Sequence, residues 1–492
     1  MYLVPLFSSV SLIFETAIMN SYLSDIFSNA PVMVVTGTAL AAMAVEAAHR
    51  TRPVITSYVS LVGLTIAAVL AAANLTGEGL SFNTMVKDGG YANYFGTLFC
   101  IVAIMTVVIS RNYFEQQKYH RGEFYILLLF TTVGMMLIAS ANDLIILFLG
   151  IELMSVCLYI LAGFIRMKGR ANEAALKYFL LGAFSTGFLL YGIALIYGAV
   201  GSTNLLTIQN AFTSVSTNLL FVIGVGLLII GLAFKVAAVP FHMWAPDVYE
   251  GSPTTVTAFM STGVKAAAFS AFIIVFIRTC DFLGGRVNDL IAILAAASMI
   301  LGNVVAIAQT NIKRMLAYSS IAHAGYMLSG IAAGTLDGQV GVMFYLVAYS
   351  FMNIGAFAIV SFLEREDDKN LLLEDYHGLS RQQPLLAFLM AVFMFALAGV
   401  PPFAGFFGKY YIFFAAIKSH MTWLAIVGVL MSLVSAYYYI RVVVLMYFRE
   451  GRSDVEFKPS RAALAVVVAC AFAVFVLGLF PSFIVQIAQR YF

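Results

Sequence analysis

Apolar runs of about 20 residues, the length that crosses a bilayer as a helix, recur along almost the whole chain. We predict transmembrane spans at 30–48, 55–74, 92–110, 124–140, 142–164, 172–199, 217–239, 254–279, 288–308, 315–333, 340–362, 385–417, 424–448 and 462–488. With 62% hydrophobic residues and a mean hydropathy of +0.95, the 492-residue chain has more apolar surface than a water-soluble core could bury. The sequence therefore predicts an all-α polytopic membrane protein with about 14 transmembrane helices.

Lysine and arginine residues are concentrated in alternate loops between these spans. The basic loops contain Arg50 and Arg52; Arg111, Lys118 and Arg121; Arg166, Lys168 and Arg170; Lys313 and Arg314; Arg365, Lys369 and Arg381; and Arg449, Arg452, Lys458 and Arg461. The opposite loops hold only Lys87, Arg278, Arg286, Lys418 and Arg490. The positive-inside rule therefore predicts that the basic loops are cytoplasmic and that both termini lie outside the cytoplasm.

The first 29 residues contain no lysine or arginine but include Glu15 and Asp25. A cleaved signal peptide normally begins with a basic region, so this composition argues against one. Two interpretations stay open, an extra N-terminal helix or an upstream start with Met19 as the alternative initiator.

Two of the predicted spans are interrupted by proline. Pro240 breaks the apolar region 217–265, and Pro401 and Pro402 break the span 385–417 about 160 residues later. Similar residues flank the two breaks, and a lysine is close to each, Lys235 before the first and Lys409 after the second. This is the pattern that an internal repeat with discontinuous helices leaves in a sequence.

Five ionisable residues lie inside the predicted spans: Glu152, Lys177, Lys235, Lys265 and Lys409. Each costs about 2.5–3.5 kcal/mol on insertion scales, so such residues usually face a protein interior or a wet cavity. One lysine alone could be a buried ion pair or a snorkelling side chain, but one glutamate cannot neutralise four lysines. Because burial and neighbouring charges move the pKa of lysine and glutamate, the set suits a proton relay.

Two histidines are weaker candidates. His242 follows the first proline break, and His323 lies in the span LAYSSIAHAGYML. Imidazole titrates near neutral pH, so either residue could relay protons, although a hydrogen-bonded packing role is the simpler interpretation for each. Asp247 and Glu250 lie at the predicted cytoplasmic mouth, where we expect Glu250 to act on a helix end beside Ser252 and Pro253.

Motifs for cofactors, metals and nucleic acid are missing from the sequence. Cys100, Cys157, Cys280 and Cys470 are scattered through apolar runs without a CxxC pair, and there is no GxGxxG motif. A net charge of +3, spread over many loops, does not suggest a nucleic-acid partner. We therefore expect no catalytic, cofactor-binding or metal-binding residues in this chain.

Five stretches resemble subunit N of bacterial proton-pumping NADH:quinone oxidoreductase (complex I), a relative of Mrp-type antiporter subunits. They are AFKVAAVPFHMWAPDVYEGSPTTVTAFMSTGVKAAAF, NEAALKYFLLGAFSTGFLLYGIALIYG, QTNIKRMLAYSSIAHAGYML, GVPPFAGFFGKYYIF and SAYYYIRVVV. The resemblance implies two inverted five-helix repeats, each with a discontinuous helix. We therefore divide the chain into 1–29, 30–123, the repeats 124–280 and 281–448, and 449–492.

The resemblance also assigns the buried charges by motif position. Glu152 matches the glutamate of helix 5, Lys177 and Lys235 the lysines of helices 6 and 7, Lys265 that of helix 8, and Lys409 that of helix 12. It implies that Glu152 pairs with Lys177, that Lys235 and Lys265 hold and pass the proton, and that Lys409 connects to a second half-channel.

The same resemblance implies a proton-translocating subunit in the bacterial inner membrane. Its partners would be the antiporter-like subunit M and the small subunits A, J and K, and flavin, iron–sulfur clusters and quinone would bind elsewhere in the complex. Two alternatives stay open at this point. The chain could serve an Mrp-type or formate-hydrogenlyase-type antiporter, or its buried charges could be a purely structural scaffold.

Overall fold

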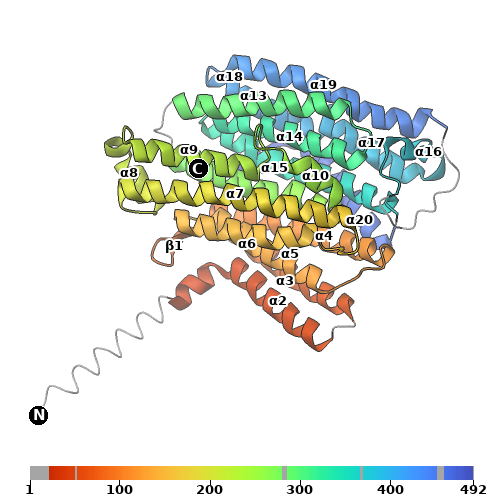
Figure 1. The fold of residues 1–492 in the computed structure, drawn as a ribbon, viewed down its shortest axis with the longest axis horizontal. Coiled ribbons are helices and arrows are strands. Elements are labelled where there is room, and N and C mark those ends of the chain that lie inside the picture. The colour runs from red at the N-terminus through yellow and green to blue at the C-terminus, as the bar shows by residue number, and fades with distance from the viewer. Residues whose placement is uncertain (1–21, 50–51, 280–284, 366–368, 451–458, 491–492) are drawn as a thin grey trace, which may run out of the picture.

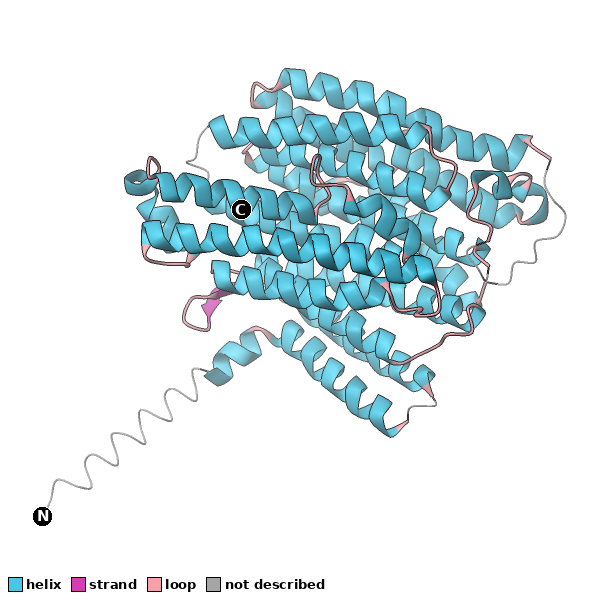
Figure 2. Cartoon of the chain, viewed as in Figure 1, coloured by secondary structure: helices cyan, strands magenta, loops and turns pink. Residues whose placement is uncertain are grey.

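Long helices lie side by side and make up most of the chain (Figures 1 and 2). The computed structural model describes residues 22–49, 52–279, 285–365, 369–450 and 459–490. Six residues that entered the predictions above lie outside the described residues: Glu15, Met19, Arg50, Cys280, Arg452 and Lys458. Within the described residues the fold is all-α apart from one short hairpin, as predicted.

The hairpin connects two of the first helices. Residues 22–28 are helical and lead into α2 (Ala30–Ala48), α3 (Pro53–Ala73) and α4 (Gly90–Gln116). Between α3 and α4, strands β1 (Glu78–Ser81) and β2 (Val86–Gly89) pair antiparallel, from Glu78 opposite Gly89 to Ser81 opposite Val86. The sequence analysis did not predict this hairpin.

The middle of the chain contains α5 (Glu123–Ser140), α6 (Leu144–Ala162), α7 (Gly169–Val200), α8 (Leu205–Val215), α9 (Leu219–Lys235) and α10 (Trp244–Gly251). One composite helix follows, consisting of α11 (Thr254–Phe259), the π-helical segment η1 (Met260–Val264), α12 (Lys265–Phe272) and a second π-helical segment η2 (Ile273–Thr279). Residues Thr254–Ile277 of this composite helix are entirely buried inside the protein.

The last part of the chain contains α13 (Gly285–Ile307), α14 (Ile312–Ala332), α15 (Leu336–Leu363), η5 (Leu373–Tyr376), α16 (Leu379–Gln382), α17 (Pro384–Ala398), α18 (Ala404–Lys418), α19 (Thr422–Phe448), α20 (Arg461–Leu479) and α21 (Ser482–Gln489). Helix α15 packs against the composite helix α11–η1 and is itself almost completely buried. The buried core therefore runs along these two neighbouring helices.

Eleven helices in the described residues are long and apolar enough to cross a membrane. They match eleven of the predicted spans. The other three predicted spans also contain helices, but these helices are too short or too polar to be counted, for physical reasons. Helix α14 carries Lys313, Arg314 and His323 on 21 residues, and the regions 217–239 and 385–417 are interrupted helices. The total of about 14 helices and the two inverted repeats stay predictions.

The two interruptions have the same backbone pattern. Ala237 and Gly399 have positive φ angles of 58° and 89°, and each donates to the carbonyl three residues before it, Phe234 and Ala396. The next residue, Ala238 or Val400, donates to the carbonyl five residues before it. Both helices thus end in a Schellman motif, and a cis X-Pro bond follows at the same spacing, before Pro240 and before Pro402.

Contacts between loops define two ends of the bundle. At one end, which we call the basic end, Lys168 contacts Glu364, Lys313 donates to the Ser252 carbonyl, and the Ser460 amide donates to Asn112. At the other end, the hairpin residue Thr84 accepts from Asn142 and Asn204, and Asp337 pairs with Lys418. The described parts of the basic loops gather at one end, as the alternation of charge requires.

Helices α5 and α6 approach closely because glycines meet at their interface. A Cβ atom added at Gly134 would lie 2.7 Å from the Met154 amide nitrogen and 2.8 Å from the Gly150 carbonyl oxygen. Small residues at such crossings let helix backbones touch, which drives helix association in membranes.

We expect Gly134→Ala to push α5 and α6 apart and to destabilise the protein by about 1–3 kcal/mol, the usual cost of overpacking. The measurement is the midpoint of thermal aggregation of the detergent-solubilised complex. Gly187→Ala on α7 is the control, because a Cβ there has no neighbour within 4 Å. An equal midpoint for both variants would contradict close packing at Gly134.

Candidate functional site

Three of the predicted lysines are deeply buried. Lys235, Lys265 and Lys409 are 6%, 2% and 5% exposed, and they come from α9, α12 and α18. Burying an ammonium group requires hydrogen-bond partners that replace its water. The nature of those partners decides what each lysine can do.

Lys235 is the last residue of α9, where the helix breaks. Its Nζ donates to the Ser155 hydroxyl of α6 at 2.8 Å. Ser155 is three residues after Glu152, so both side chains face the same way from α6. Glu152 Oε1 in turn accepts from Thr186 of α7 at 2.8 Å. Glu152 and the serine that binds Lys235 are thus about one helical turn apart on α6.

Lys177 is not part of this group. Its Nζ lies 2.8 Å from both Glu173 and Asp247, and its side chain is 42% exposed. The predicted pair between Glu152 and Lys177, both of them described residues, is therefore wrong. Glu152 meets α7 at Thr186, nine residues beyond Lys177, which is roughly 13 Å along a helix.

A network of ion pairs surrounds Lys177 at the basic end. Arg314 of α14 donates through one nitrogen to Asp247 at 2.8 Å and to Glu250 at 2.9 Å. The network lines a hollow of about 210 Å³. Glu250 thus binds a guanidinium group, where the sequence suggested an effect on a helix end. Because both Asp247 oxygens are bound by cations, this network ties α10 to α7 and α14.

Lys265 follows a π-helical turn. Segment η1 ends at Val264, and Lys265 donates to the Ser320 carbonyl at 2.7 Å and to the Ser320 hydroxyl at 2.6 Å. A π-turn inserts an extra residue into a helix, which rotates the following side chains, and such turns are frequent at functional sites. Lys265 is thereby bound to α14.

His323 lies one turn further along α14. Its Nδ1 is 2.6 Å from the Tyr345 hydroxyl of α15, and its Nε2 is 3.0 Å from the Tyr439 hydroxyl of α19. The Tyr439 hydroxyl also bonds Ser319. His323 is 1% exposed and fully hydrogen-bonded within the protein. Both ring nitrogens are therefore joined to groups that can give or accept a proton.

Lys409 fills the gap left where α17 ends. Its Nζ donates to the carbonyls of Leu397 and Ala398 at 3.2 and 2.9 Å, and to the Ser432 hydroxyl at 2.8 Å. The last carbonyls of a helix lack intrahelical partners and carry the negative end of its dipole, so they suit an ammonium group. The same Nζ lies 4.9 Å from the ring centre of Tyr326, three residues after His323.

One face of α14 therefore runs between two buried lysines. Ser320, His323 and Tyr326 follow at intervals of three residues, from Lys265 at one end to Lys409 at the other. The sequence analysis singled out His323 but missed the serine and tyrosine partners. The spacing of three polar side chains in QTNIKRMLAYSSIAHAGYML was the available signal.

His242 lies in the break between α9 and α10 and is half-buried. Its Nδ1 is buried without a hydrogen-bond partner in the described structure. Other groups hold the backbone of this break, since Ser298 accepts from the Val239 amide at 2.9 Å and Phe234 accepts from the Trp244 ring at 2.9 Å. The His242 ring also interacts with the backbone of Pro240 inside the break, so it remains bound to this segment.

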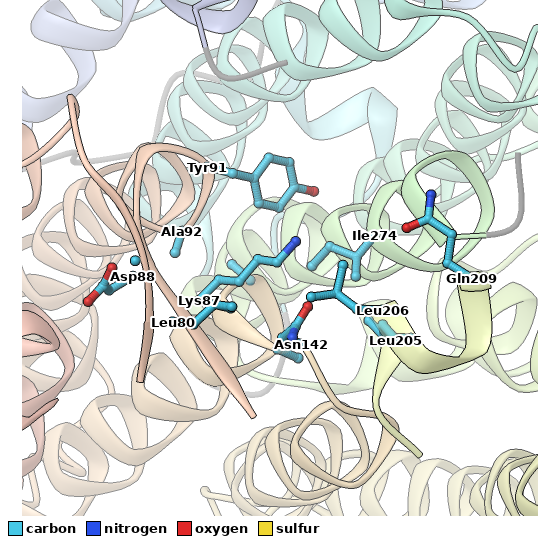
Figure 3. Close-up of a pocket in the computed structure, with 13 residues that line it drawn as sticks. Leu80, Lys87, Asp88, Tyr91, Ala92, Asn142, Leu205, Leu206, Gln209 and Ile274 are labelled. Atoms are coloured by element: carbon cyan, nitrogen blue, oxygen red, sulfur yellow. The ribbon is translucent and has the colours of Figure 1, made fainter. Parts of the chain in front are cut away.

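A cavity of about 420 Å³ lies beyond Lys265 at the hairpin end (Figure 3). Lys87 of β2 extends into it beside Tyr91, Asn142 and Ile274. The Tyr91 hydroxyl donates to the Ser270 carbonyl at 3.0 Å, five residues after Lys265 on α12. The composite helix thus leads from the basic end, past Lys265, to a mainly apolar cavity at the opposite end, which the Lys87 side chain enters.

Metal ligands do not cluster in the part of the chain that the structure describes. Cys100, Cys157 and Cys470 are buried and carry free thiols. The chemistry that the buried groups share is proton exchange, since lysine, glutamate, histidine and hydroxyl side chains all donate or accept protons.

Comparisons with known proteins identify the family. Residues 141–435 match a family model described as NADH:quinone oxidoreductase/Mrp antiporter, transmembrane. The NADH-quinone oxidoreductase subunit N 1 of Chloroherpeton thalassium is 46% identical over 470 residues, which are 95% of this chain and 98% of that relative. The chain belongs to the subunit N family. The resemblance predicted from the sequence is thereby confirmed.

Solved structures agree with this membership. A chain of respiratory complex I from Thermus thermophilus with bound aureothin matches this subunit N chain with a TM-score of 0.81 at 35% identity, covering 93% of this chain and 98% of that chain. A chain of the Mrp complex from Dietzia sp. DQ12-45-1b has a TM-score of 0.84 at 19% identity, covering 94% and 97%. That second likeness shows a shared fold alone.

We expect Asp247→Asn to weaken subunit N at the basic end, because it removes ion pairs to both Lys177 and Arg314. Partly exposed pairs contribute about 0–1 kcal/mol each, so a loss of roughly 1 kcal/mol should lower the midpoint of thermal aggregation by a few degrees. Glu115→Gln is the control, since it removes a surface pair with Arg111 on one helix. A larger effect in the control would contradict the bridging role of Asp247.

Proposed function

We propose that this subunit N chain carries protons through the membrane arm of NADH-quinone oxidoreductase, coupled to quinone reduction elsewhere in the complex. The observation that supports the proposal is the row of buried proton-exchanging groups between Lys265 and Lys409 along α14. Family membership supports the coupling to NADH oxidation.

The proposed route has three lysines, and one segment of α14 links two of them. Lys235 lies beside Glu152 through Ser155, and Lys265 begins the segment that Ser320, His323 and Tyr326 extend to Lys409. A proton on one lysine disfavours a proton on a nearby one, because like charges repel strongly where water is scarce. Transfer can then proceed stepwise, with each occupied station pushing the next proton on.

Membership of the subunit N family also suggests where the protein lies and which subunits surround it. We propose that the basic end faces the cytoplasm of a bacterium, that both termini face the periplasm, and that the surrounding bilayer is the inner membrane. Subunits M, A, J and K would be the membrane-arm partners, and flavin, iron–sulfur clusters and quinone would bind to other subunits.

The division of the subunit into 1–29, 30–123, 124–280, 281–448 and 449–492 is part of this proposal. The matching Schellman motifs at Ala237 and Gly399 support a common origin for the two broken helices. An Mrp-type antiporter subunit is the alternative function, and it shares the fold. Sodium-dependent transport without coupling to NADH oxidation would favour that alternative.

We expect Lys235→Ala to reduce proton pumping at least tenfold while leaving assembly intact, because it removes a buried proton carrier whose partner is a neutral hydroxyl. The measurement is acidification of inside-out vesicles during NADH oxidation. Lys418→Ala, which removes an exposed lysine paired with Asp337, should pump normally. Full pumping by Lys235→Ala would refute its role as a carrier.

Lys235→Met separates the relay from a structural scaffold. A methionine side chain fills a similar volume without a charge, and buried charges that serve only structure can often be replaced in this way without loss. A relay should fail in this variant, whereas a scaffold should keep both its stability and its pumping.

We expect His323→Gln to slow pumping several-fold with little change in thermal stability. Glutamine can still bond the Tyr345 and Tyr439 hydroxyls, but it cannot accept and release a proton near neutral pH. The rates of NADH oxidation and vesicle acidification, together with the aggregation midpoint, are the measurements. Normal pumping would assign His323 to packing alone.

A further inference from the structure

Glu364 is a buried carboxylate that the proposed route does not use. It follows α15 directly and is 2% exposed. A carboxylate that is buried so completely needs specific partners to replace water. Those partners come from three separate parts of the chain.

Each carboxylate oxygen of Glu364 has a hydroxyl donor. Tyr113, near the end of α4, donates to Oε1 at 2.9 Å, and Thr254, the first residue of α11, donates to Oε2. Lys168, in the loop between α6 and α7, places its Nζ 3.7 Å from Oε1. Glu364 thus contacts one cation on its outer side and the start of the composite helix on its inner side.

The outer side of Glu364 is close to water. Lys168 lines an open hollow of about 790 Å³ at the basic end, together with Arg170, Lys369 and Asp375. The Lys168 side chain is 19% exposed, whereas that of Glu364 is 1% exposed. A single side chain therefore separates the buried carboxylate from the hollow.

The inner side of Glu364 leads to Lys265. Thr254 and Lys265 lie on the same composite helix, eleven residues and roughly 16 Å apart. Helix α15 packs against α11 and η1 and runs antiparallel to them, since its last turn lies beside the first residue of α11. Asn353, eleven residues before Glu364 on α15, is therefore at about the depth of Lys265.

Buried polar atoms with unused hydrogen-bonding capacity occur on these two helices. They are Thr255 Oγ1 and the amide atoms of Asn353, all buried in the described structure, and the Tyr349 hydroxyl lies beside Asn353 and Ser320. Buried polar atoms are normally hydrogen-bonded, and ordered water supplies the bond where protein does not. These atoms are suitably placed to bind water molecules between Glu364 and Lys265.

Other acidic groups at the basic end are less suitable as proton acceptors. Asp247 has an ammonium group on one oxygen and a guanidinium group on the other, and Arg314 never gives up its proton. Tyr376 of η5 also lies near Glu364, but burial first, and then the charges of Asp375 and Glu364, raise the pKa of Tyr376 well above its ordinary value. Its hydroxyl therefore stays neutral.

We propose that Glu364 is the residue through which protons enter subunit N from the basic end, on their way along the α11–α15 interface to Lys265. This inference rests on the proposed function. The carboxylate takes one proton from water at the Lys168 hollow, which neutralises it and releases its ion pair with Lys168. It then gives that proton to water on the inner side and becomes charged again.

The test uses the intact complex in inside-out vesicles with Glu364→Gln. The amide keeps the shape of the side chain, its oxygen can accept from one of the hydroxyls of Tyr113 and Thr254 and its NH2 group can donate to the other, but it cannot carry a proton. We expect normal assembly, at least a fivefold loss of NADH-driven acidification, and partial recovery with a shifted pH profile in Glu364→Asp. Groups that face residue 364 and could contribute to that profile are Lys168, Tyr113 and Tyr376.

Glu46→Gln is the matched control. Glu46 is also a buried carboxylate, 6% exposed, and it accepts a hydrogen bond from Thr56 at 2.6 Å, but it lies on α2, away from the composite helix. This variant should pump normally. If Glu364→Gln fails to assemble, Thr254→Val decides the matter, since it leaves Glu364 in place and removes the inner hydroxyl.

Two results would overturn the proposal. One is normal acidification with an unchanged pH profile in Glu364→Gln, and the other is normal acidification in Thr254→Val when the glutamine variant does not assemble. Lys235→Ala, measured in parallel, distinguishes a failure of the proposed function from a failure of the role of Glu364 alone. If Lys235→Ala pumps normally, the proposed function fails; if it does not pump but Glu364→Gln does, only the role of Glu364 fails.

Discussion

Each of the three buried lysines of the proposed route is held by neutral oxygen atoms. Lys235 binds a serine hydroxyl, Lys265 a serine hydroxyl and its carbonyl, and Lys409 two helix-end carbonyls and a hydroxyl. A hydroxyl can donate as well as accept, so it can bond an amine in either protonation state. A carboxylate partner would instead favour the charged form strongly. Lys177, which does lie between two carboxylates, is at the bundle's edge.

This way of holding lysines depends on how the helices are interrupted. Helix α17 stops at Ala398 inside the membrane region, and its last carbonyls become ligands for Lys409. A bilayer tolerates free backbone groups only where protein or a wet cavity satisfies them. The Lys409 ammonium group therefore supplies hydrogen bonds to the carbonyls that the break leaves free, and these carbonyls replace the water that the ammonium group loses. At the break near Pro240, Lys235 precedes the interruption. Its ammonium group binds the Ser155 hydroxyl of α6 and not helix-end carbonyls.

The sequence predicted the all-α fold, the two breaks and the burial of three lysines, because apolar run length and proline act locally. It failed for Lys177 because two other carboxylates bind its ammonium group, Glu173 one turn away and Asp247 of α10, and a contact across 70 residues is not visible in a local pattern. It could not locate the partners Ser155 and Ser320, which are 80 and 55 residues from their lysines. Glu364 was missed because it follows a span and looks like a loop residue.

The polarity of α14 has a consequence for how the protein enters the membrane. This helix has 21 residues, yet it is not among the helices that are apolar enough to cross a bilayer by themselves. Its long contact with α13, which is strongly apolar, lets the two enter as a hairpin. The polar face of α14, which joins Lys265 to Lys409, thus makes the membrane insertion of α14 dependent on α13. Protons can move along this face only after α14 is stably inserted.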